Sequence, residues 1–103
     1  MKTEAQIKAE FATLMNRHGF TPNGETNSYG EPVYSRTWSK ETEVLWYGKS
    51  ESRMEIKVSE AFGIPGLRIF RNGRPDGKMR NYTTPKRAIN AMREIVTFAG
   101  YEF

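Results

Sequence analysis

The chain has 103 residues, of which 37% are hydrophobic, 27% are charged and none is cysteine, and its formal net charge is +4. This composition excludes a disulfide framework, a thiolate metal site and a membrane-spanning segment, and the length predicts a single domain, 1–103, around one core. The charge is uneven, because residues 1–65 hold 8 Lys/Arg against 9 Glu (net −1), whereas residues 66–103 hold 8 Lys/Arg against 3 acids (net +5).

An amphipathic helix is predicted over residues 3–18. Thr3 and Gln6 form a capping-box pattern at its start. Gly19 fits the left-handed position that follows many helices, and Phe20 is placed to fold back onto the helix. The apolar stripe of this helix consists of Ile7, Phe11, Leu14, Met15 and His18.

Residues 21–32 are predicted as a loop, since two prolines, two glycines and two asparagines leave no periodic pattern. Beyond this loop we expect antiparallel strands separated by polar or glycine-containing turns. The expected strands are 33–38, 43–47, 53–58, 67–71 and 78–82. The expected connections are a turn at 39–42, a turn at 48–52, a bend at 59–66 and a loop at 72–77.

A second helix is predicted over residues 85–99. Thr84 is a natural N-cap, Pro85 suits the first helical position, and Gly100 ends the helix. Its buried face consists of Ala88, Ile89, Met92, Ile95, Val96 and Ala99. We therefore expect an α+β fold in the order α-β-β-β-β-β-α, with an antiparallel sheet of about five strands and both helices packed on one face.

Alternation along the last two strands predicts which side chains share the open face of the sheet. With Leu67, Ile69 and Met79 facing the helices, the open face receives the residues between them. These are Arg68, Phe70, Lys78, Arg80 and Tyr82. Cations interleaved with aromatic rings suit a phosphate backbone with stacked bases, so Phe70 and Tyr82 are candidates for stacking.

The predicted anion-binding residues extend from this hairpin into the start of the second helix. They are Arg68, Arg71, Arg74, Lys78, Arg80, Lys86 and Arg87. Lys86 and Arg87 oppose the helix dipole, which a phosphate or carboxylate bound at the helix N-terminus would explain, although two exposed cations also cost little there. The alternative interpretation of these seven cations is that they lie on a solvated face and pair with glutamates of earlier strands.

No catalytic or metal site is predicted. His18 is the sole histidine and Asp76 the sole aspartate, and a helix cap and a turn explain them. Residues 48–50 are similar to the end of a phosphate-binding loop, but the first glycine is missing and no helix follows. We therefore expect a protein that is not an enzyme and has no cofactor.

Two functions fit these features. The first is a non-catalytic nucleic-acid-binding module for DNA or RNA. The second is a small protein-binding regulator or inhibitor, of the kind that mobile genomes encode, which docks on an acidic surface of its partner through Arg and aromatic anchors. Neither function involves a membrane, and with no signal peptide apparent we expect a cytoplasmic protein.

Overall fold

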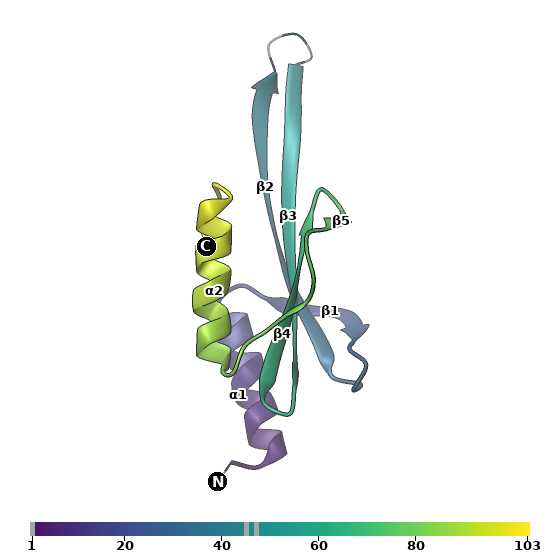
Figure 1. Ribbon diagram of the computed structural model, residues 1–103, viewed down its shortest axis with the longest axis vertical. Helices are drawn as coiled ribbons and strands as arrows, with labels where there is room; N and C mark the ends of the chain where they lie inside the picture. The colour runs from purple at the N-terminus through teal and green to yellow at the C-terminus, as the bar shows by residue number, and fades with distance from the viewer. Residues whose placement is uncertain (1, 45, 47) are drawn as a thin grey trace.

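The computed structural model describes residues 2–44, 46 and 48–103, without the side chains of 42–44. An antiparallel sheet carries both helices on one face, which confirms the predicted α+β class (Figure 1). The molecule measures 59 × 23 × 21 Å, because one hairpin extends well beyond the helices. The elements are α1 (Glu4–Arg17), β1 (Thr21–Thr26), β2 (Pro32–Val44), β3 (Gly48–Ala61), β4 (Ile64–Arg71), β5 (Arg74–Pro75), β6 (Arg80–Asn81) and α2 (Pro85–Phe98).

The core lies between the two helices and the covered face of the sheet. On the central strand β3, the alternate residues Met54, Ile56 and Val58 face inward and are fully buried. Among the described residues, no helix has the length and apolar character needed to cross a bilayer. The core consists of Phe11, Met15, Phe20, Tyr34, Trp38, Met54, Ile56, Val58, Leu67, Ile69, Ala88, Ile89, Met92 and Val96.

Local capping chemistry sets the ends of both helices. The Thr3 hydroxyl accepts from the Gln6 backbone N–H at 3.2 Å, and the Gln6 side chain accepts from the Thr3 N–H at 2.9 Å, so the predicted capping box is confirmed. The Thr84 hydroxyl accepts from the Arg87 N–H at 3.2 Å, with Pro85 in the first turn of α2. His18 is the C-cap of α1, as expected.

β2 and β3 form one long hairpin where three shorter strands were predicted. Their register runs without a break from Val33↔Ser59 to Val44↔Gly48, so the predicted turns at 39–42 and 48–52 are wrong. The predicted strand 43–47 begins within β2, and its residues 45 and 47 lie outside the described residues. This arm extends past the helices, and its residues 39–41 and 48–51 are exposed, so burial imposes no apolar alternation on these residues (Figure 1).

β1 forms where a loop was predicted. It pairs with β2 from Thr21↔Ser35 to Thr26↔Pro32, with an irregularity between Pro22 and Thr26. All six of its residues are exposed, so its sequence does not alternate between apolar and polar residues as a half-buried strand would. An edge strand also tolerates proline, which a central strand does not.

Two tight turns of the same kind connect β3 to β4 and β4 to β5. The first turn contains only residues 62 and 63, because β3 and β4 pair up to Ala61↔Ile64, so the predicted bend at 59–66 is too long. Phe62 and Gly63 have φ angles of 55° and 78°, and Asn72 and Gly73 have φ angles of 53° and 82°. Two-residue hairpin loops with positive φ at both positions favour Asn-Gly. Asn72-Gly73 follows this preference, whereas a bulky residue such as Phe62 rarely adopts this backbone region.

The C-terminal residues close the core over the end of α1. Nη1 of Arg36 donates to the carbonyl oxygens of His18 (2.8 Å) and Phe103 (2.9 Å), and its guanidinium lies 4.6 Å from the Trp38 ring centroid. The indole N–H of Trp38 donates to the Glu102 carbonyl at 2.9 Å. The C-terminal aromatic residues Tyr101 and Phe103 therefore pack back onto the core.

Candidate nucleic-acid interface

The predicted cations come from one stretch of chain that wraps an edge of the sheet. β4 turns into β5, residues 76–79 lead to β6, and β6 pairs again with β4 before Thr84 caps α2 (Figure 1). We call residues 68–87 the basic edge. Asp76 is its sole acidic residue.

Direct pairing neutralises one of the seven cations. Arg71 Nε donates to Asp76 Oδ2 at 2.6 Å. In the part of the chain that the structure describes, the other six form no ion pair, and all six are exposed. They are Arg68, Arg74, Lys78, Arg80, Lys86 and Arg87. The described glutamates of the earlier strands therefore do not neutralise these six.

The basic edge has two sides, and the cations divide between them. Leu67 and Ile69 are buried under the helices as predicted, and Arg68 lies on the open face. Arg71 and Arg80 line a hollow on the helix side, beside α2. The prediction that Arg80 shares the open face with Arg68 is therefore wrong.

Two further placements differ from the prediction. Met79, expected to face the helices, lines a hollow on the open face. Tyr82, expected on the open face, is half-buried and packs against the core. The reason is that β6 contains two residues, so strand alternation does not extend to positions 79 and 82. Of the two predicted stacking rings, Phe70 is the one that reaches the open face.

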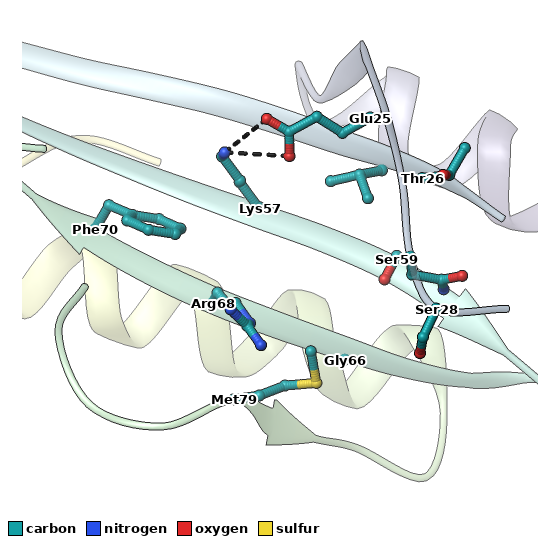
Figure 2. Close-up of a pocket in the computed structure, with 11 residues that line it drawn as sticks. Glu25, Thr26, Ser28, Lys57, Ser59, Gly66, Arg68, Phe70 and Met79 are labelled. Atoms are coloured by element: carbon teal, nitrogen blue, oxygen red, sulfur yellow. Dashed lines mark hydrogen bonds and ion pairs between the residues drawn. The ribbon is translucent and has the colours of Figure 1, made fainter. Parts of the chain in front are cut away.

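The open-face hollow has a volume of about 340 Å³. Figure 2 shows Arg68, Phe70 and Met79 on one side of it, with the end of β1 and Ser28 across from them. Its lining combines a guanidinium with hydroxyl and amide groups, which suits a phosphate or the polar edge of a base. Its size also falls within the usual range of small-ligand sites.

A second cation in this hollow, Lys57, is already paired. Its ammonium lies 2.9 Å from Oε1 of Glu25 and 5.0 Å from the centroid of the Phe70 ring (Figure 2). Phe70 is half-buried, so part of its ring is already covered. Among the described residues, Arg68 is therefore the cation of this hollow that forms no ion pair, and Phe70 has limited surface for stacking.

Gly66 shapes the rim of this hollow. A Cβ at this position would lie 2.9 Å from Oδ1 of Asn81 and 3.3 Å from Sδ of Met79. The missing side chain therefore lets the 79–81 segment close against β4. Close approach of a neighbouring segment is one reason for glycine inside a strand, and this signal was present in the sequence but was not used.

The helix-side hollow contains an exposed aromatic residue that the sequence analysis missed. Phe98 is 92% exposed and lines this hollow of about 430 Å³ together with Arg71, Arg80 and Ile95. The residue falls outside the buried stripe predicted for the second helix, so its exposure could have been foreseen. An aromatic ring beside arginines is typical of protein-interface anchors.

The environment of the single histidine does not suggest catalysis. Burial lowers the pKa of His18, and the charges of Arg93, Arg17 and Arg36 lower it further. Its ring lies 5.7 Å from that of Phe103, within the C-terminal closure of the core. Over the described ranges, no three His, Cys, Asp or Glu side chains gather as a potential metal site.

Comparison with protein-family models, with curated proteins and with solved structures finds no match to this chain. A functional proposal therefore depends on the geometry and charge of the residues themselves. The basic edge and the two hollows beside it are the features that such a proposal must explain.

Proposed function

We propose that this chain is a non-catalytic nucleic-acid-binding module whose basic edge contacts the phosphate backbone. The supporting observation is the charge of the basic edge: six exposed cations that form no ion pair among the described residues lie on a stretch of chain with a single acid. Nucleic acids carry one negative charge per nucleotide, and cations that contact them release condensed counterions. Four of the six are arginines, whose planar guanidinium binds phosphate oxygens in pairs.

The open-face hollow extends the proposed site beyond the backbone contacts. Arg68 offers a free guanidinium there, and Phe70 offers the exposed part of its ring. Stacking of one base on an aromatic ring contributes about 1–3 kcal/mol, and Lys57 already covers part of this ring. Phosphate contacts therefore dominate the proposed affinity, and base contacts are secondary.

Charge reversal at the basic edge tests this proposal. The triple variant Arg74→Glu, Lys78→Glu, Arg80→Glu changes three exposed cations that have no ion-pair partner in the described structure. A matched variant, with Lys2, Arg17 and Lys49 changed to glutamate, alters the net charge equally at exposed positions outside the basic edge.

Binding of both variants to a fluorescent oligonucleotide, single-stranded or duplex, is measured at about 50 mM salt. The edge variant is expected to bind at least about 30-fold more weakly than wild type, since each lost phosphate contact removes a charge-assisted hydrogen bond. The matched variant is expected to stay within about threefold. Equal losses in the two variants would mean that net charge alone drives binding, and would overturn the proposal.

A second candidate is a protein-binding regulator that docks on an acidic surface through the helix side of the basic edge. Phe98 supports it, because a 92% exposed aromatic ring beside Arg71 and Arg80 resembles an interface anchor. Phe98→Ser separates the two candidates. The nucleic-acid proposal predicts unchanged oligonucleotide affinity, whereas the regulator predicts that a nuclease-resistant protein complex from host extract is lost.

A further inference from the structure

The turn between β3 and β4 exposes an aromatic residue that the fold itself does not favour. Phe62 has a φ angle of 55° and is 85% exposed. Gly63 follows with a φ angle of 78°, so both central residues of the loop have positive φ. Asparagine and glycine suit this conformation, and a bulky side chain does not.

The same chain provides the control for this comparison. The next turn, Asn72-Gly73, has nearly the same φ angles and carries the favoured residue, whose Oδ1 also accepts from the Arg53 N–H at 2.9 Å. At the first turn the strained backbone is held instead by Glu60, a buried residue whose Oε1 accepts from the Gly63 N–H at 2.6 Å. Backbone strain at an exposed residue points to a functional use of its side chain.

Phe62 belongs to an apolar patch at the turn between β3 and β4, and this turn lies at the end of the sheet away from the long arm of β2 and β3 (Figure 1). Its ring packs edge-to-face on Tyr29, with centroids 5.2 Å apart and planes at 78°, and Tyr29 is itself 62% exposed. Ile64, the next residue after the turn, is exposed as well. We call Tyr29, Phe62 and Ile64 the aromatic end.

A hollow of about 450 Å³ lies beside the aromatic end, with apolar and acidic walls. Ile7 and Ala61 contribute to the apolar wall. Three carboxylates line it against one cation, Lys8, whose ammonium lies 3.3 Å from Oε1 of Glu4 and 2.8 Å from Oε1 of Glu31. The carboxylates are Glu4, Glu31 and Glu60, so the formal charge of the lining is −2.

We infer that the aromatic end is a docking site for a protein segment that carries a large apolar side chain flanked by Lys or Arg. The apolar side chain would fill the hollow against Tyr29 and Phe62, and the flanking cations would meet the surplus carboxylates. The charge of the lining opposes that of the basic edge, so a nucleic acid is repelled here while a basic peptide is attracted. The two surfaces therefore serve different partners, and this inference does not depend on the function proposed for the basic edge.

The test uses two synthetic 12-residue peptides with one central phenylalanine, one flanked by lysines and one by glutamates. The full chain labelled with ¹⁵N is titrated with each peptide, and amide shifts and Kd are measured. The lysine peptide is expected to shift residues 29 and 60–64. Phe62→Asn, which places the favoured residue in the turn, is expected to weaken this binding at least about 10-fold, and Tyr29→Ser gives an independent loss at the same site.

The matched control is the Arg74, Lys78 and Arg80 triple reversal, which leaves the aromatic end intact and is expected to bind the lysine peptide at least as well as wild type. The docking site is refuted if Phe62→Asn binds the peptide as tightly as wild type, or if the glutamate peptide binds equally well. Self-association of the free chain that Phe62→Asn abolishes would also overturn it, because the occupant would then be a second copy.

Discussion

Two single substitutions, Asn72→Phe and Phe62→Asn, test whether the fold requires Phe62 at its turn. Asn72→Phe places a bulky residue at a φ of 53°, which costs about 1–2 kcal/mol. It also removes the hydrogen bond from the Arg53 N–H to Asn72, which contributes about 1 kcal/mol. The expected loss in the free energy of unfolding is therefore about 2–3 kcal/mol.

Phe62→Asn has opposing effects that nearly cancel. It relieves about 1–2 kcal/mol of backbone strain. The ring is 85% exposed, so the substitution gives up only about 30 Å² of buried surface, or about 0.8 kcal/mol. Loss of the edge-to-face contact with Tyr29 adds about 0.5 kcal/mol. The free energy of unfolding is expected to change by less than about 1 kcal/mol in either direction.

Urea unfolding followed by circular dichroism gives both values, and the slope with urea shows whether the denatured state is comparable. The expected order is wild type close to Phe62→Asn, with Asn72→Phe clearly less stable. If Phe62→Asn is the more damaging of the two changes, the turn argument is wrong, and Phe62 is required by the fold rather than available to a partner.

Two other perturbations address the closure of the core. Phe103→Ala removes a half-buried ring that packs on Phe20 and Trp38, and is expected to lower the free energy of unfolding by about 2 kcal/mol; a loss below about 0.5 kcal/mol would show that the C-terminus contributes no packing. The pKa of His18 is lowered in the fold, so the unfolded chain binds more protons once pH falls below about 6.5, and stability is expected to decrease with falling pH there. His18→Gln should flatten this part of the pH profile, and an unchanged profile would contradict the assignment.

Both helices were predicted from the sequence because their signals are local. The Thr3–Gln6 capping box and the Thr84-Pro85 start depend on residues within one turn of each other, and the structure contains both. Apolar spacing then identified the buried faces. These interactions need no knowledge of where the rest of the chain lies.

The strands depended on information that is not local. The polar stretch 39–42 has the composition of a turn, yet it continues β2 because each residue finds a partner on β3. The polar edge strand β1 likewise follows from pairing with β2, which its own residues do not signal. Period-2 patterns predict strands where one face is buried, whereas residues 39–41 and all of β1 are exposed.

The sequence predicted which cations belong to the candidate site better than it predicted which face of the sheet each one lies on. Regular alternation in β4 correctly placed Arg68 on the open face, opposite Leu67. Beyond the Asn72-Gly73 turn the alternation fails, because the chain pairs with β4 over the two residues of β5, leaves the sheet, and returns for the two residues of β6. That turn also brings Arg71 to Asp76, a pairing that depends on the loop's three-dimensional course.

The central proposal, that the basic edge contacts phosphates, is tested most directly by the salt dependence of oligonucleotide binding by the wild-type chain. Six cations of the basic edge form no ion pair in the described part of the chain, and if all six contact single-stranded phosphates the slope of log K against log salt is about −4. Affinity would then fall roughly 300-fold between about 50 and 200 mM salt. A slope near zero, or no binding at about 50 mM salt, would contradict the proposal.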